Sequence, residues 1–209
     1  DLIEIPGTGK VYDAISSHGD IYLCKISGGL LVAPVQLPWI REGLLKNGIS
    51  YIPGTRDPGG RYPENVKYNA AQIGRRLIHN TNHTDPAVLL KAKEYGLELI
   101  NVKQGYTKCN LVVVDENAAI TSDMGLYAAL TKHGIDVLPI SQGYVRLEGF
   151  PYGFLGGASG RVGDEIVFNG NLSLHPDFHA IKEFIQKRGL EALWFEDYPL
   201  EDIGSIIHL

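Results

Sequence analysis

The sequence predicts an α/β fold, a five-unit α/β propeller of β-β-α-β repeats that forms a single domain over residues 1–209. The end of the repeat is visible four times, as KNGISYIP, EYGLELIN, KHGIDVLP and KRGLEALW. A helix-length segment precedes each of these ends, and two short β-type runs precede the helices. Units of roughly 40 residues that leave unused strand segments at both termini favour closure into a ring, because closure protects the strand edges.

The helices are expected to begin near PWIREGLL, PAVLLKAKE, MGLYAALTK and PDFHAIKEFIQ. Three of these segments have a proline close to the first helical position, which tolerates the missing N–H group. Asp85 and Asp123 occupy the N-cap position of two helices. Each segment ends in a glycine with a basic residue one to three positions before it, which predicts a left-handed residue just beyond the helix.

The strands that precede each helix are exemplified by CNLVVVD with AAIT, and by YNAAQIG with RRLIHN. Insertions lengthen two units, GTRDPGGRYPEN after Pro53 and GYVRLEGFPYGFLGGASG after Gln142. The N-terminal KVYDAIS and the C-terminal SIIHL remain outside the four units. We expect these two segments to pair as the fifth unit and close the ring.

Composition indicates an ordinary globular protein, with 44% hydrophobic and 21% charged residues among 209. The net charge of -5 and the lack of a basic stripe argue against nucleic-acid binding. The sequence contains no long apolar run and no basic leader, so membrane contact is not expected and a cytoplasmic location is predicted. Two cysteines cannot build a disulfide framework, and neither a metal nor a cofactor is expected.

The unit TKCNLVVVDENAAITSDMGLYAAL resembles the pentein superfamily in its Asn-led apolar strand, acidic turn and Ala-Ile strand before a helix. That superfamily includes arginine deiminase, amidinotransferases, dimethylarginine hydrolase and a ribosome anti-association factor. The resemblance extends from Gly19 to the C-terminus and points to a bacterial branch, without selecting one activity. It implies a small polar ligand and leaves the oligomeric state open.

The resemblance also implies catalytic residues, because pentein enzymes attack a guanidinium carbon with a cysteine thiolate assisted by a histidine in an H-x-D setting. His175 and Asp177 in SLHPDFH match that setting, and Cys109 is the better placed of the two cysteines. Asp123 or Asp177 is the carboxylate partner. The enzymes carry their cysteine late in the chain, after the histidine, and this sequence departs from that order.

Each of these residues also has a structural interpretation. Cys109 aligns with Tyr68 in the preceding unit and could be a small buried filler. His175 precedes a proline, as Asp85 does, and could cap a helix. Asp177 lies in the first helical turn, where the helix dipole favours any acid.

Four residues are predicted to bind substrate. Asn69 and Asn110 begin the inner strands of two units, where an amide either orients a polar ligand or satisfies a turn. Arg56 and Arg61 lie in the first insertion and could pair with a carboxylate or simply face solvent. The glycines of GFLGGASGRVGD permit either close backbone packing or a mobile lid.

Two functions follow. The first is a hydrolase or amidinotransferase that acts on a guanidine or related C–N group through Cys109. The second is a non-catalytic binding protein on the same ring fold, like the anti-association factor. The missing late cysteine favours the second.

Overall fold

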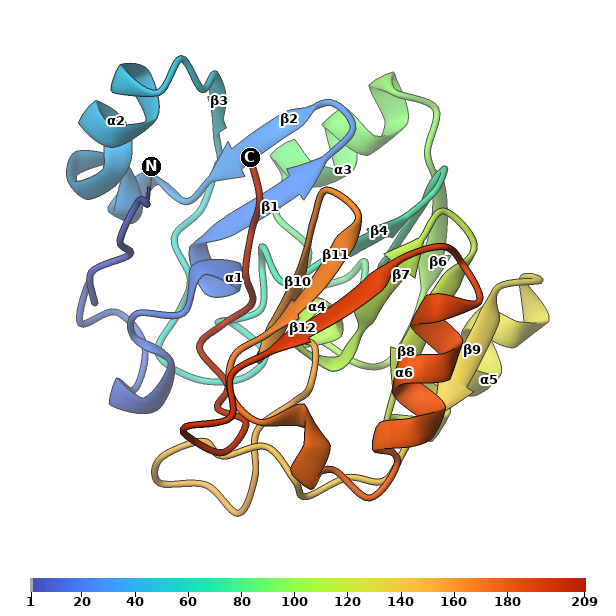
Figure 1. Ribbon diagram of the computed structural model, residues 1–209. Coiled ribbons are helices and arrows are strands. Elements are labelled where there is room, and N and C mark those ends of the chain that lie inside the picture. The colour runs from blue at the N-terminus through green and yellow to red at the C-terminus, as the bar shows by residue number, and fades with distance from the viewer. Residues whose placement is uncertain (1) are drawn as a thin grey trace. The chain divides into compact units, whose positions relative to one another are not determined.

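The computed structural model describes residues 2–209, which form two compact units (Figure 1). One unit runs to Thr107 and includes Leu209, and the other is Lys108–His208. Within residues 2–209 the strands form four three-stranded sheets, two in each unit.

The first unit begins with short helices and then contains two sheets with a helix each. Its elements are η1 (Asp13–Ile15), α1 (Gly19–Tyr22), β1 (Leu23–Ile26), β2 (Gly29–Val32), η2 (Pro34–Gln36), α2 (Leu37–Lys46), β3 (Tyr51–Pro53), β4 (Ala71–Ile73), β5 (Arg76–His79), α3 (Pro86–Glu94) and β6 (Glu98–Asn101).

The second unit has the same order of strands and helices. Its elements are α4 (Thr107–Asn110), β7 (Val112–Asp115), β8 (Ala118–Thr121), α5 (Met124–Lys132), β9 (Asp136–Pro139), β10 (Ser159–Val162), β11 (Glu165–Phe168), η3 (Leu172–Leu174), α6 (Phe178–Gln186) and β12 (Glu191–Trp194). We number the sheets 1 to 4 in chain order.

All four sheets share one topology. The first two strands pair antiparallel through a tight turn, and the third strand returns after the helix to pair parallel with the second. The order of elements predicted for the four segments is therefore found, and the structure is a mixed α/β fold. The predicted strand runs correspond to β4, β5, β7 and β8.

The helix ends follow the predicted chemistry. Asp85 accepts a hydrogen bond from the backbone N–H of Ala87 at 2.9 Å, and Asp123 accepts from those of Gly125 and Leu126 at 2.8 and 2.9 Å. A glycine with a φ of +64° to +73° follows each of the four main helices, at positions 48, 96, 134 and 189. The left-handed conformation that glycine adopts readily thus ends every one of these helices.

The predicted fifth unit does not form as paired strands among the described residues. The segment around KVYDAIS contains the short 3-10 helix η1, and residues 205–209 have no regular secondary structure. The backbone N–H of Ile206 instead donates to the carbonyl of Ser159 at the start of β10, at 2.9 Å. Closure of a five-unit ring is therefore not among the observed features.

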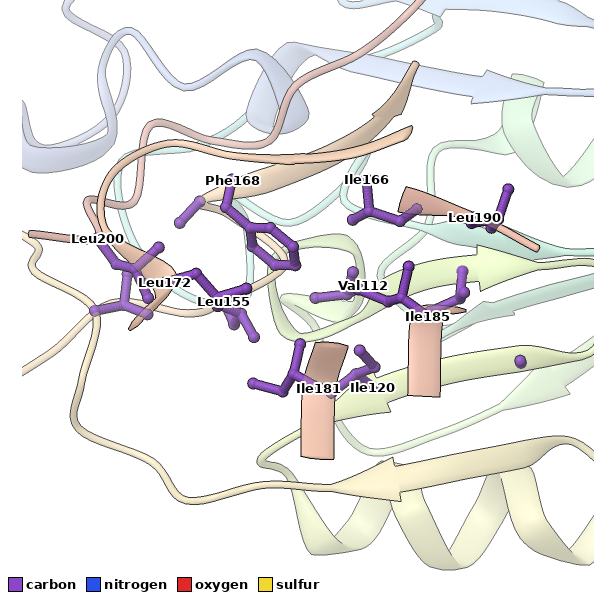
Figure 2. Close-up of a cluster of buried hydrophobic side chains, with 14 residues drawn as sticks. Val112, Ile120, Leu155, Ile166, Phe168, Leu172, Ile181, Ile185, Leu190 and Leu200 are labelled. Carbon is purple, nitrogen blue, oxygen red and sulfur yellow. The ribbon is translucent and has the colours of Figure 1, made fainter. Parts of the chain in front are cut away.

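The core of the second unit lies around α6 (Figure 2). Ile181 and Ile185 of this helix are fully buried and belong to the same cluster as Ile120 of sheet 3 and Ile166 of sheet 4. The helix α6 thus lies between these two sheets and packs against both. Among residues 2–209 no helix combines the length and the hydropathy that a membrane span requires.

Candidate functional site

Cys109 lies on the short helix α4. Its position before the apolar run LVVVD had predicted the start of a strand, and this prediction is wrong. The turn that leads into α4 is held by the side chain of Gln104, whose Oε1 accepts from the Tyr106 N–H at 3.0 Å. The Thr107 hydroxyl adds a bond to the Gln104 carbonyl at 3.0 Å. Only 4% of Cys109 is exposed, so its thiol is largely withdrawn from solvent.

The glycine-rich loop packs directly on the backbone of Cys109. The Gly157 N–H donates to the Cys109 carbonyl at 2.8 Å. A Cβ atom on Gly156 would lie 2.5 Å from that carbonyl oxygen and 2.6 Å from that of Leu111. Of the two roles predicted for these glycines, close backbone packing is therefore the one observed.

His175 and Asp177 form a connected pair at the start of α6. The Asp177 N–H donates to Nδ1 of His175 at 3.1 Å, so this nitrogen is unprotonated and Nε2 carries the proton. Nε2 donates to the Ser141 carbonyl at 3.2 Å, while the Ser141 N–H donates to Oδ2 of Asp177 at 2.6 Å. Together the two side chains fasten the start of α6 to the segment that follows β9.

Burial lowers the pKa of His175 below its usual value, although Asp177 opposes the shift because Nδ1 and Oδ2 are only 3.8 Å apart. The hydrogen bond from the Ser141 backbone lowers the pKa of Asp177. His175 is therefore the neutral member of the pair at neutral pH. The expected N-cap position of His175 is wrong by two residues: α6 begins at Phe178, and Asp177 precedes it without a side-chain cap.

Asp123 lies at the N-terminus of α5, where its Oδ1 accepts hydrogen bonds from two backbone N–H groups. These bonds confirm the N-cap position predicted for Asp123. Its α5 cap and the His175–Asp177 pair lie in the same compact unit as Cys109.

Asn69 and Asn110 are both buried, and neither begins a strand. β4 starts at Ala71, and β7 starts two residues after Asn110, which ends α4. The side-chain amide of Asn69 donates to the Asp20 carbonyl at 3.3 Å. The two amides thus belong to the interior of their units.

Arg56 and Arg61 are exposed on the first insertion. The structure uses the backbone of Arg56: its N–H donates to Asp85 at 2.9 Å, and its carbonyl accepts from the Tyr68 hydroxyl at 2.7 Å. Both arginine side chains are accessible to a ligand from solvent.

Three buried carboxylates, Asp20, Asp85 and Asp202, were not predicted as site residues. Asp85 accepts from Thr55, Arg56 and Ala87, and burial together with this carboxylate raises the pKa of Tyr68. Asp202 accepts from the Phe154 and Gly204 N–H groups at 2.9 and 3.1 Å. A Cβ on Gly157 would lie 2.0 Å from its Oδ1, so Asp202 and Cys109 are linked through Gly157. Only the density of glycines in the loop could have indicated such a partner.

A pocket of about 510 Å³ in the first unit contains none of the predicted site residues. It lies between the N-terminal segment and α2, and its lining includes Leu2, Glu4, Trp39 and Lys46. No group of three or more metal-ligating side chains comes together in residues 2–209.

Comparison with known proteins assigns the sequence to a family. A family model described as "Family of unknown function (DUF6873)" matches residues 1–207. The chain belongs to this family. No curated protein matches the sequence.

Several solved structures of the pentein superfamily are similar to this chain in fold. DDAH from Pseudomonas aeruginosa, a cysteine-to-serine mutant complexed with citrulline, has a TM-score of 0.56 and 10% identity over 86% of this chain and 69% of its own. Agmatine deiminase from C. jejuni has a TM-score of 0.54 and 12% identity, over 80% and 61% of the two chains. SxtG, an amidinotransferase from Microseira wollei in the saxitoxin biosynthetic pathway, gives 0.52 and 10%, over 87% and 64%. The predicted likeness to the superfamily is thereby confirmed at the level of the fold.

Proposed function

We propose that this protein acts on a guanidino compound as a hydrolase or an amidinotransferase, with Cys109 as the nucleophile. The observation that carries the proposal is the fold shared with three kinds of guanidine-modifying protein. The chain spans 61% to 69% of their lengths. The five-unit ring predicted from the sequence remains part of this proposal.

The chemistry begins with the Cys109 thiolate, whose sulfur forms a bond to the guanidinium carbon. The C–N bond to the leaving amine then breaks, and the amine departs with the proton that His175, neutral at rest, has taken from the Cys109 thiol. The product is an S-linked amidino intermediate. Attack by water releases a ureido product and the thiol in a hydrolase, whereas attack by an acceptor amine transfers the amidino group.

Other residues would hold the substrate. Asp177 and Asp123 can pair with the cationic nitrogens, since a planar guanidinium is bound well by carboxylates. Arg56 or Arg61 would bind a carboxylate on the substrate, and the amides of Asn69 and Asn110 would orient polar groups. His175 must exchange one of its two ring hydrogen bonds for the leaving nitrogen before it donates a proton.

Thiol alkylation across pH, combined with turnover of a panel of guanidino compounds, tests this function. We expect Cys109 to react in the native protein with a pKa below the ordinary value of about 8.5. Cys109→Ser should reduce turnover by about 10³-fold or more. Cys24→Ser is the matched control, because Cys24 is also buried but lies in sheet 1. An inert Cys109, or full turnover by Cys109→Ser, would reject the nucleophile.

A non-catalytic binding protein on the same fold is the second candidate. The observation in its favour is that Cys109 is 4% exposed, while both ring nitrogens of His175 bond to the backbone. Purification from native extract separates the two functions. A stoichiometric partner without turnover of any guanidino compound supports the binding protein, and turnover without a partner supports the enzyme.

A further inference from the structure

One face of sheet 4 is not covered by any described helix of the second unit. On β11 and β12, Ile166, Phe168, Ala192 and Trp194 face the core shared with α6. The alternate residues point to the opposite side, where Glu165 pairs in register with Glu191, and Val167 with Leu193. We call these four residues the open face. Leu193 is 42% exposed, Val167 is half-buried, and both glutamates are exposed.

The corresponding face of sheet 3 is covered. There the register pairs Ala118 with Asp136 and Ile120 with Leu138. Ile120 is fully buried in the cluster that contains Ile181 and Ile185 of α6, and Leu138 packs against that cluster. The helix α6 therefore covers the face of sheet 3 that is equivalent to the open face of sheet 4.

A basic residue completes this contact. Arg188, just beyond α6, forms ion pairs with Asp136 and with Asp115, the latter at 3.2 Å. Asp136 begins β9 as Glu191 begins β12, so an acid occupies the same place on both sheets. The helix that covers this face of sheet 3 thus carries apolar residues at positions 181 and 185, followed by an arginine at position 188.

Within the second unit, Leu193 and both glutamates of the open face are exposed. The C-terminal tail lies on the β10 side of the open face, where a Cβ on Gly160, which pairs in register with Val167, would lie 2.0 Å from the Ile206 carbonyl oxygen. Glu165 and Glu191 form no ion pair with any residue that the structure describes. A second copy is a poor occupant, because two open faces in contact would bring four glutamates together.

We propose that the open face of sheet 4 binds an amphipathic helix of a partner protein. This helix would carry two apolar residues four positions apart, packed on Val167 and Leu193. A lysine or arginine in the next turn would pair with Glu191. The inference does not depend on the proposed catalytic function, because it uses none of the residues assigned to it.

A peptide with the sequence of residues 176–190 of this chain is a suitable probe. It contains the helix α6, which covers the face of sheet 3 equivalent to the open face. Its binding to the intact protein can be followed by fluorescence anisotropy after fluorescein labelling. Leu193→Asp should weaken binding about tenfold or more, since it places a charge in the apolar contact. Leu99→Asp is the matched control: Leu99 is 43% exposed on the outer strand of sheet 2. It should leave binding unchanged.

A charge reversal provides a second test that does not require Leu193→Asp to fold. Glu191→Lys should weaken binding of the peptide, and Arg188→Glu within the peptide should restore it. Hydrogen exchange should show added protection at residues 165–168 and 191–195. The proposal is overturned if the peptide does not bind, if binding ignores both substitutions, or if sedimentation shows a dimer of the free protein that Leu193→Asp dissociates.

Discussion

Sheets 3 and 4 have the same topology and lie in the same unit, yet one is covered by helices on both faces and the other on one. The central strand β8 is buried at all four positions, whereas β11 alternates between exposed or half-buried and buried residues. Their sequences reflect this, as AAIT carries no charge and EIVF begins with Glu165. The comparison teaches that the helix of the following segment decides whether a strand is buried on its second face.

The largest test of this difference compares alanine substitutions at Ile120 and Leu193. Ile120→Ala should lower the free energy of unfolding by about 2 to 5 kcal/mol, because it leaves a cavity beneath α6. Leu193→Ala should cost about 0.5 kcal/mol or less, since its side chain lies at the surface. Urea denaturation measures both. Equal losses would mean that the second face of sheet 4 is covered in solution.

Removing residues 206–209 enlarges the uncovered part of sheet 4 and also tests the predicted ring. Ile206 and Ile207 are half-buried, so their loss should cost roughly 2 to 3 kcal/mol together. For a chain of this size the melting temperature should fall by roughly 4 to 12 °C. An unchanged melting temperature would show that the tail is loose, and closure of a five-unit ring would fall with it.

Arg188 tests the polar part of the contact between α6 and sheet 3. Its guanidinium group pairs with two aspartates and lies 3.7 Å from the ring centre of Phe184. Arg188→Ala should cost about 1 to 2 kcal/mol, and Arg188→Lys should recover only part, because lysine lacks the planar fork. Lys187→Ala is the control, since Lys187 forms an exposed pair with Glu183 and should cost about 0.5 kcal/mol or less. Similar losses for both alanine variants would contradict a special role for Arg188.

The smallest expected effect is the pH dependence contributed by His175 at the start of α6. The pKa of His175 in the folded protein lies below the unfolded value of about 6.5. Its contribution to the free energy of unfolding is therefore complete above that pH and is lost as the pH falls towards the folded pKa. His79 adds a similar loss between about pH 6.5 and 4, because burial lowers its pKa to about 4. His175→Gln should therefore reduce, and not abolish, the fall in stability below pH 6.5. Thermal melts from pH 4 to 8 measure this dependence of stability on pH. If the His175→Gln variant shows the same dependence as the original protein, His175 does not contribute to it.

Much of the fold could be predicted because its signals are local. The glycines that end the helices, such as Gly134, adopt positive φ as expected, and Asp85 and Asp123 cap the helices that follow them. The predicted pairing of KVYDAIS with SIIHL is not observed as strands among the described residues, and no local signal fixes such a pairing, because it depends on contacts distant in sequence. In the second unit, the Ile206 N–H bonds to the Ser159 carbonyl.

The sequence indicated which residues are candidates for the site better than it indicated where their side chains lie. The H-x-D pattern placed His175 and Asp177 together, and their Nδ1 and Oδ2 atoms lie 3.8 Å apart. Sequence reasoning placed Cys109 on a strand, because the apolar run after it hides the turn that Gln104 and Thr107 build. It missed Asp202, whose link to Cys109 passes through Gly157, 45 residues away in sequence.

The position of α6 between two sheets has a consequence for unfolding. Ile181 and Ile185 pack on sheet 3 and sheet 4 at once, so neither sheet can open without exposing the apolar surface of this helix. The amide hydrogens of α6, β8 and β11 are therefore expected to exchange as a single cooperative block with one common opening free energy. Lys108–His208 would then behave as one foldon, although its sequence reads as two separate modules.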